Sequence, residues 1–203
     1  MPEIIEYGDF KTTGKQKKKK QIILCHTSRE VGEYLSSIKH RLNGKFDRIP
    51  NYVITREGTI LKLLPDIGHS NFFKEENVNR NGIIVSLENL GWVEKEPLKD
   101  HYRNWIGNIY KGPIIDKKWR DYFFWQPYTD VQYERLFFLC NKLCDDFKIN
   151  KKTIGHNTKF PGIEKFDGVV TKSNYDAIFT DVSPAFDFEK LNKLFEDEQT
   201  RRN

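Results

Sequence analysis

Three side chains have the types and positions of a catalytic metal site. His26 follows the apolar residues 22–24, and His156 ends the short run 153–156. Asp181 lies in a loop before the last segment with helical spacing. Two imidazoles and one carboxylate, delivered by strand ends and a loop, are a common ligand set for a catalytic zinc ion, which keeps one position open for water. The pattern therefore predicts a zinc hydrolase site, with Zn²⁺ as the cofactor.

The hydrophobic pattern predicts the elements that would position these residues. Residues 21–25 are almost entirely apolar, which suits a strand buried on both faces. Apolar side chains at helical spacing predict a helix over 29–42, and Thr129 with Gln132 has the spacing of a capping box that opens another helix. Further strands are predicted at 52–55, 59–63, 82–88 and 152–155, and a last helix at 187–195. This alternation predicts an α/β fold, a single domain with a mixed central β-sheet flanked by α-helices.

Two long stretches, 89–127 and 157–180, have no clear periodicity. The first contains all four tryptophans, Trp92 among them. Plain loops of this length are uncommon, and long loops more often serve binding. We therefore expect 89–127 to be an irregular binding insertion.

The charge balance indicates a basic surface. The chain has 203 residues, with 34 Lys+Arg against 29 Asp+Glu and a net charge of +5. Four lysines are consecutive at 17–20. They predict a loose, solvated basic arm over 1–20, ahead of one domain at 21–203. Attraction to nucleic acid or an acidic wall polymer is the functional alternative. Because the chain has no recognised nucleic-acid motif, a nucleic-acid partner is not expected.

The cysteines and the hydropathy indicate where in the cell the protein is expected. Cys25, Cys140 and Cys144 are odd in number and irregular in spacing, so a disulfide framework is not expected. Cys140 and Cys144 lie four apart on a predicted helix and should pack as small hydrophobic side chains. The sequence shows neither a signal-peptide pattern nor an apolar run of membrane-spanning length. It therefore predicts a cytoplasmic protein without a membrane span.

Several short motifs, taken in their order, resemble those of the zinc N-acetylmuramoyl-L-alanine amidases. This family includes phage lysozymes, bacterial amidases and animal peptidoglycan-recognition proteins. The resemblance runs from about residue 21 to 195 and rests on His26-Thr27, 52–60, Gly68-His69, 81–89, 127–133, 154–156 and 181–187. It implies a mixed sheet with flanking helices, and hydrolysis of the amide between N-acetylmuramic acid and L-alanine of the stem peptide.

The resemblance implies that His26, His156 and Asp181 are the zinc ligands. Many relatives have two consecutive histidines at the first position, and the first of them aligns with Cys25. A thiolate also binds zinc, so Cys25 is the reserve ligand. Asp187 is the rival carboxylate, although its position before a helix also suits an N-cap.

The resemblance also suggests groups that assist catalysis. Many relatives have a glutamate where this chain has Ser86, and Glu88, two residues on along the same strand face, is the candidate general base. Some relatives use a tyrosine close to the position of Tyr52. Relatives often have a lysine two residues before the third ligand, where this chain has Phe179. Lys172 and Tyr175 are therefore the candidate proton donors, with Lys172 preferred.

His69, Asn51 and Trp92 are the candidate substrate-binding residues. Together these features predict a zinc-dependent amidase in which a zinc-activated water cleaves peptidoglycan or muropeptides. The expected form is a monomeric endolysin of the phage type, which reaches the cell wall by a route such as holin-mediated release, and a cytoplasmic recycling enzyme is the other form considered. The alternative is a recognition module that binds peptidoglycan without cleaving it, which the missing lysine and the displaced glutamate favour.

Overall fold

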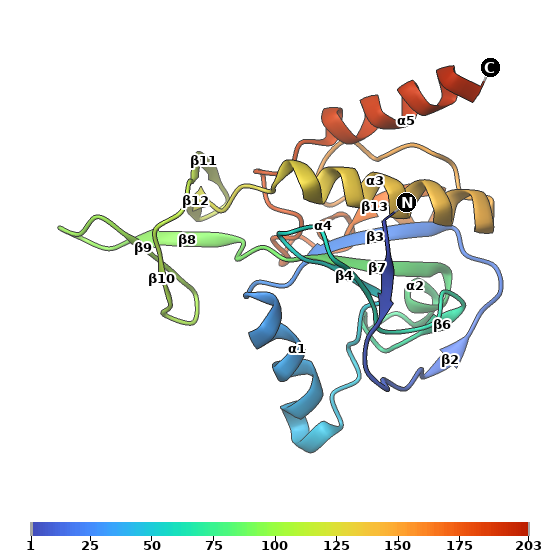
Figure 1. The fold of residues 1–203 in the computed structure, drawn as a ribbon, viewed down its shortest axis with the longest axis horizontal. Helices are drawn as coiled ribbons and strands as arrows, with labels where there is room; N and C mark the ends of the chain where they lie inside the picture. The colour runs from blue at the N-terminus through green and yellow to red at the C-terminus, as the bar shows by residue number, and fades with distance from the viewer. Residues whose placement is uncertain (1, 203) are drawn as a thin grey trace.

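The computed structural model describes residues 2–202, and a six-stranded sheet lies at its centre (Figure 1). The strand order is β1-β5-β4-β7-β3-β13. The strands are β1 (Ile4–Glu6), β3 (Gln21–His26), β4 (Tyr52–Ile54), β5 (Ile60–Lys62), β7 (Gly82–Leu87) and β13 (Gly168–Thr171). β4, β7, β3 and β13 are parallel, whereas β5 runs antiparallel to β4. The predicted mixed sheet is therefore confirmed.

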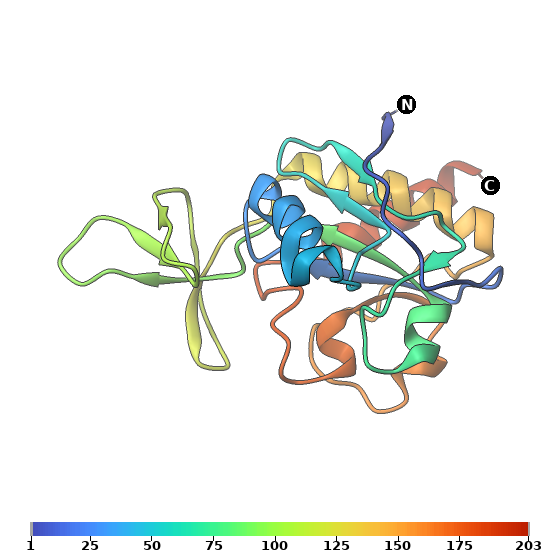
Figure 2. The ribbon, with the colours of Figure 1, turned by 90° about the horizontal axis from the view of Figure 1, so that it is seen from below.

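Helices cover both faces of this sheet (Figures 1 and 2). α3 (Asp130–Phe147) and α5 (Phe188–Arg202) pack on one face, over a core that contains Ile22 and Leu24 of β3. α1 (Val31–His40), α2 (Glu76–Asn81) and α4 (Lys172–Tyr175) lie on the other face, where Ile23 and Val53 are buried. Both faces of β3 are thus apolar, as its continuous hydrophobic run predicted.

Short elements complete the main domain. β2 (Gly14–Lys15) pairs with β6 (Gly68–His69), and 3₁₀ helices span Arg41–Gly44 and Ile163–Lys165. At the start of α3, Thr129 and Gln132 form the predicted capping box. Asp187 accepts a hydrogen bond from the backbone N–H of Lys190 at 2.9 Å, which is the geometry of an N-cap on α5.

The first twenty residues are not a loose arm, and that prediction is wrong. β1 pairs in parallel with β5 at the edge of the sheet. Lys19 is buried, and its ammonium donates to the carbonyls of Arg80 at 3.0 Å and Gly82 at 3.1 Å. Burial lowers the pKa of Lys19 to about 8. A run of lysines predicts solvated side chains. The Lys19 ammonium is buried instead, because backbone carbonyls at the end of α2 and the start of β7 accept its hydrogen bonds.

Residues 92–125, which we call the arm, form a second β-sheet within the described chain. The prediction that 89–127 is irregular is therefore wrong. The order of the arm's antiparallel strands is β10-β9-β8-β12-β11. They are β8 (Trp92–Lys95), β9 (Tyr102–Asn104), β10 (Ile109–Tyr110), β11 (Ile115–Trp119) and β12 (Tyr122–Trp125). The arm projects from the main domain beyond the carboxyl ends of β3 and β7 (Figures 1 and 2). Because each strand has only two to five residues, no long alternation marks it in the sequence.

The short strand predicted at 152–155 is not a regular strand in the structure. Residues 152–155 make only one bridge, from Thr153 to Val169. The strand that pairs with β3 is β13, inside the stretch 157–180 that showed no periodicity. No helix among residues 2–202 is long and apolar enough to cross a membrane.

Candidate active site

A cleft lies at the carboxyl end of β3, where open sheets with parallel strands commonly bind ligands. Its volume is about 240 Å³. α1 forms one side, and the loop before Val182 forms the other. The cleft is lined by residues that include His26, Asp181, Lys172, Tyr34, Arg29, Arg48, Phe72, Trp105 and Phe179.

His26 offers a neutral imidazole at the inner end of the cleft. Its Nδ1 lies 3.0 Å from the hydroxyl of Ser28. Its Nε2 is buried and has no hydrogen-bond partner among the described residues. Burial lowers the pKa of His26, so the ring is neutral near pH 7. A neutral imidazole with a free nitrogen can accept a proton or bind a metal ion.

Asp181 faces His26 across a short gap. Its Oδ1 lies 3.8 Å from His26 Nε2 and accepts a hydrogen bond of 2.8 Å from the backbone N–H of His26. Burial raises the pKa of Asp181, but the neighbouring His26 and the Lys172 ammonium lower it by more. The net pKa is below the usual value, so Asp181 is a buried carboxylate.

Lys172 approaches Asp181 from the start of α4. Its Nζ lies 3.7 Å from Asp181 Oδ2. The ammonium also lies over the rings of Phe179, at 4.2 Å, and Phe72, at 5.3 Å. The two rings and the carboxylate hold the cation in the cleft. The structure thus brings Lys172, the candidate proton donor, beside the expected ligands His26 and Asp181.

The structure does not bring His156 to this cluster. The His156 Nδ1 lies 3.1 Å from the hydroxyl of Thr158, and its carbonyl accepts a hydrogen bond from Asn174 at 3.0 Å. The side chain that faces the Asp181 loop is the next one, since Asn157 donates to the carbonyl of Val182 at 2.5 Å. The expectation that three ligands already converge is therefore corrected.

Zinc fits one part of this site. His26 Nε2 and Asp181 Oδ1 are close enough for one ion to bind both at the ~2.1 Å that is typical of zinc ligands. No group of three His, Cys, Asp or Glu side chains in residues 2–202 is placed to hold a metal ion. The described site therefore supplies two of the three expected donors.

Cys25, the reserve ligand, precedes His26 in β3 and so points to the opposite face of the strand, where it is buried with Ile23. Its Sγ is 3.0 Å from the hydroxyl of Ser86. Burial, and then the charge of Asp181, raises the pKa of Cys25 to about 12. A protonated thiol is a poor zinc ligand, because the thiolate is the form that binds.

Glu88 has a different environment from that of a general base, and this prediction is also corrected. Its Oε1 accepts from the backbone N–H of Val31 at 2.7 Å, and its Oε2 accepts from that of Arg56 at 2.8 Å. The carboxylate therefore holds the first turn of α1 against the hairpin between β4 and β5. Strand alternation indicated the face of Glu88 but not these competing donors.

Tyr52, Asn51 and Trp92 also lie outside the cleft. The Tyr52 hydroxyl donates to Asp66, and its ring packs in the core under α3. The Asn51 amide bonds the carbonyls of Pro65 and Gly68 at 3.0 Å each, so it joins strands rather than facing solvent. The Trp92 ring stacks on Tyr122 in the arm, at 4.4 Å.

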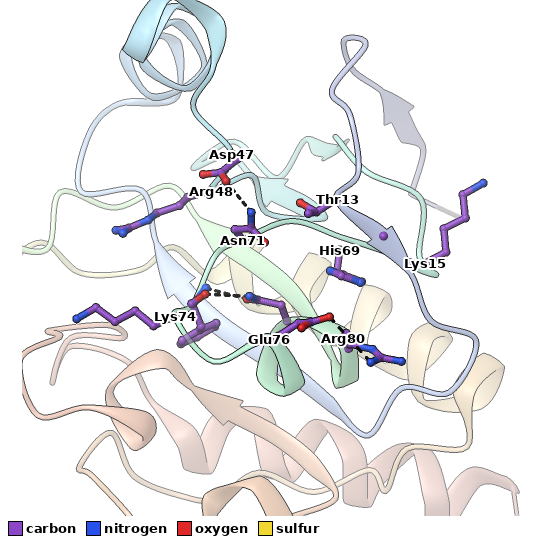
Figure 3. A pocket seen from close by; sticks show the side chains of 12 residues that line it. Thr13, Lys15, Asp47, Arg48, His69, Asn71, Lys74, Glu76 and Arg80 are labelled. Carbon is purple, nitrogen blue, oxygen red and sulfur yellow. Dashed lines mark hydrogen bonds and ion pairs between the residues drawn. The ribbon is translucent and has the colours of Figure 1, made fainter.

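His69 lines a different cavity, of about 680 Å³. Figure 3 shows it between Thr13 and Lys15 of the N-terminal segment on one side and Glu76 and Arg80 of α2 on the other. Arg48 also lines the cleft and so lies between the two cavities. The candidate substrate-binding residues are thus spread over the core, the arm and a neighbouring cavity.

Sequence reasoning missed several residues of the cleft wall. Tyr34 lies in the helix predicted at 29–42, and Trp105 is one of the four tryptophans of the insertion; neither was a candidate site residue. The Trp105 indole N–H donates to the carbonyl of Ser28 at 2.7 Å, and Arg29 lies over the ring at 4.7 Å. The sequence held one signal. Ser28 and Arg29 come directly after His26, so any residue that contacts them must lie near the cleft.

Comparison with known proteins provides independent information on this chain. A family model described as N-acetylmuramoyl-L-alanine amidase matches residues 11–167, most of the chain. The match contains His26 and His156 and ends before Lys172 and Asp181. No curated protein matches the chain.

Several solved structures share the fold. The endolysin N-acetylmuramoyl-L-alanine amidase LysCS from Clostridium intestinale URNW is 15% identical, with a TM-score of 0.58 and 97% of each chain covered. The hydrolase AmiA from Staphylococcus aureus, with its ligand, is 10% identical, with a TM-score of 0.58 over 99% of this chain and 85% of that one. The amidase AmiD from E. coli, with anhydro-N-acetylmuramic acid-L-Ala-D-gamma-Glu-L-Lys, is 14% identical, with a TM-score of 0.51 over 92% and 60%.

Proposed function

The chain belongs to the N-acetylmuramoyl-L-alanine amidase family, and on this basis we propose that it hydrolyses the amide between N-acetylmuramic acid and L-alanine of the peptidoglycan stem peptide. The cluster of His26, Asp181 and Lys172 in one cleft carries the proposal. An amide is a poor electrophile with a poor leaving group. The site must therefore stabilise the charge that develops on the carbonyl oxygen, activate water and protonate the departing amine.

The three side chains can divide these tasks. The Lys172 ammonium, held by Asp181, supplies positive charge where the carbonyl oxygen becomes negative, and it can deliver a proton to the amine. The neutral His26 ring can offer the lone pair of its free Nε2 to a metal ion that activates water. Asp181 contacts both the Lys172 ammonium and the backbone N–H of His26, and so holds the two residues in place relative to each other.

We also propose that the site uses zinc, held by His26 and Asp181 with His156 as the third donor. The unpartnered Nε2 and the buried carboxylate support this assignment. A bound zinc ion supplies a water of lowered pKa and polarises the scissile carbonyl. His156 can join only if its ring moves toward the other two donors, away from Thr158 and Asn174, and each hydrogen bond lost in this way costs ~0.5–1.5 kcal/mol.

The biological role that we propose is that of a monomeric endolysin, made in the cytoplasm and delivered to the wall by a route such as holin-mediated release. The likeness to the endolysin LysCS over nearly the full length of both chains supports this role. The net charge of +5 also favours approach to an anionic wall.

Product analysis tests the reaction directly. Purified protein is incubated with sacculi, and the soluble products are identified by mass spectrometry. We expect stem peptides with a free L-alanine amine, lost on treatment with a chelator and restored by Zn²⁺. Metal analysis should give one zinc per chain. Products that all retain the muramoyl–alanine bond would contradict an amidase.

A recognition module that binds peptidoglycan without cleaving it is the second candidate. The displacement of His156 from the other donors and the serine at position 86 favour it. In that case sacculi would retain the protein without release of any peptide, and metal analysis would find no zinc. The amidase proposal requires both product and metal.

A further inference from the structure

The arm is fastened to the rim of the cleft on the side of α1. Trp105 lies in the turn between β9 and β10, is 45% exposed, and donates from its indole to the carbonyl of Ser28 at 2.7 Å. In the same turn, the Asn108 amide donates to the Glu33 carboxylate of α1 at 2.9 Å. An exposed indole therefore lies where the cleft opens onto the arm.

A second turn of the arm reaches the opposite wall. Arg120, between β11 and β12, donates to the carbonyl of Phe179, two residues before Asp181. Its guanidinium lies over the Trp119 ring at 4.1 Å. The arm is thus attached at both walls of the cleft.

One face of the arm carries a row of exposed side chains that we call the arm row: Ile109, Arg103, Glu94 and Phe123. Ile109 is paired with Arg103, and Arg103 with Glu94. The pairing of Phe124 with Val93 places Phe123 opposite Glu94. Ile109 is 55% exposed and Phe123 47%. The row crosses four strands, a span of about 14 Å at the usual strand spacing.

We propose that the arm row binds the glycan strand of the substrate, so that the enzyme prefers long glycan chains to free muropeptides. This inference rests on the proposed function, because the bond to be cut hangs from a sugar within a strand. The neighbouring sugars must leave the cleft along its rim, and Trp105 and the arm lie there. The arm row then gives these sugars a surface beyond the cleft.

The chemistry of the row suits sugars better than a protein partner. Sugar rings have apolar C–H faces and polar edges, and the row has the apolar Ile109 and Phe123 at its two ends with the charged Arg103 and Glu94 between them. The Lys118 ammonium beside the Phe123 ring adds another donor, at 5.6 Å. A stable protein interface would need a larger, continuous apolar core.

A double variant, Ile109→Ser with Phe123→Ser, tests the proposal. Both side chains are exposed and lie outside the cleft, so the fold should be kept. The matched control is Ile5→Ser with Leu42→Ser, which removes two exposed apolar side chains from the main domain. Two readouts are compared: cosedimentation with sacculi on ice, and kcat/KM on a muramoyl-peptide without a glycan chain.

We expect the arm variant to need about tenfold more sacculi for half-maximal binding, because two apolar side chains that would contact sugar rings are lost. Its kcat/KM on the small substrate should stay within about twofold of wild type, and the control should match wild type in both assays. Prior digestion of the sacculi to disaccharide units should remove the wild-type advantage.

Two results would overturn the inference: unchanged sacculus binding by the arm variant, or equal losses on both substrates. A changed oligomeric state in size-exclusion chromatography, with sacculus binding intact, would assign the row to self-association instead. If wild type cleaves neither substrate, the proposed function fails, but cosedimentation still decides whether the arm row binds glycan.

Discussion

The two parts of the candidate zinc site differ in how the chain holds them. His26 ends a strand that is paired on both sides, and Asp181 is fixed to it by the His26 backbone N–H at 2.8 Å. His156 lies in a turn, half-buried, with its ring hydrogen-bonded to Thr158 at 3.1 Å. We call these the strand-borne part and the turn-borne part.

The difference teaches how such a site is assembled. The strand-borne part is positioned by the same hydrogen bonds that build the sheet, so its geometry needs no ligand. The turn-borne part has an alternative position, in which the His156 ring is hydrogen-bonded to Thr158. Only the free energy of metal binding can move the ring from there to the other two donors. Substitutions in the strand-borne part should therefore cost more activity than substitutions in the turn.

The largest effect is expected for Asp181→Ala. This substitution removes a donor and releases both Lys172 and the His26 backbone, so kcat/KM on sacculi should fall on the order of 10³-fold, with bound zinc lost. Circular dichroism should show a folded protein. Asp187→Ala is the matched control: it removes the N-cap of α5, so stability should fall by ~1 kcal/mol while activity is kept. If Asp187→Ala were the inactive variant, the rival carboxylate would be the ligand.

Lys172→Met should lower kcat by about 10²-fold with little change in KM, because the ammonium acts on charge that develops in the transition state. Lys172→Arg should recover part of the loss through its positive charge. Lys152→Met is the matched control, since Lys152 lies over the Phe166 ring at 5.1 Å outside the cleft. Equal effects of the two Met substitutions would mean that lost cation–π packing, not catalysis, explains the result.

His156→Ala should weaken zinc affinity by about 10–10²-fold with little effect on thermal stability, since the ring is half-buried and its hydrogen bonds are to Thr158 and, at 3.4 Å, to Asn174. Equilibrium dialysis with Zn²⁺ measures this change. His40→Ala, at an exposed position at the end of α1, and Cys25→Ser should both bind zinc like wild type. If His156→Ala bound zinc normally and Cys25→Ser lost affinity, Cys25 rather than His156 would be the third zinc ligand.

The sequence predicted the central elements because their signals are strong and local. The apolar run at 21–25, the hairpin at 52–63 and the capping box at Thr129 each became the expected element. β13 was missed because its four residues, starting at Gly168, are too few to show a period and gain their stability from pairing with β3. The arm was missed for the same reason.

The candidate site was predictable where residues sit at strand ends, and less so elsewhere. His26 was placed correctly by the apolar run before it. His156 and Glu88 depended on where a side chain points after a strand ends, and that direction is set by competing hydrogen bonds with Thr158, Val31 and Arg56. No spacing rule in the sequence contains those partners. Lys19 is a similar case. Its lysine neighbours in the sequence predict an exposed side chain, but three backbone carbonyls accept hydrogen bonds from its ammonium and allow its burial.

The smallest effect on activity is expected for Glu88→Gln, which tests how the strand-borne part is supported. Glu88 follows β7, the strand that pairs with β3 beside His26, and its carboxylate accepts from the N–H groups of Val31 and Arg56. The glutamine side chain has one acceptor oxygen, so one of these two buried donors loses its partner. The free energy of unfolding should fall by ~1–3 kcal/mol.

The chemistry itself should be nearly untouched, because Glu88 is already occupied by backbone donors. Corrected for the folded fraction, kcat should stay within about twofold of wild type, and urea titration with activity assays on the same samples measures both quantities. Glu57→Gln, the same change at an exposed position in the adjacent turn, should alter neither. A fall in kcat of ~10²-fold or more at full stability would instead restore Glu88 as the general base. The carboxylate would then have to exchange its bonds to Val31 and Arg56 for one to water, and α1 would move as substrate binds.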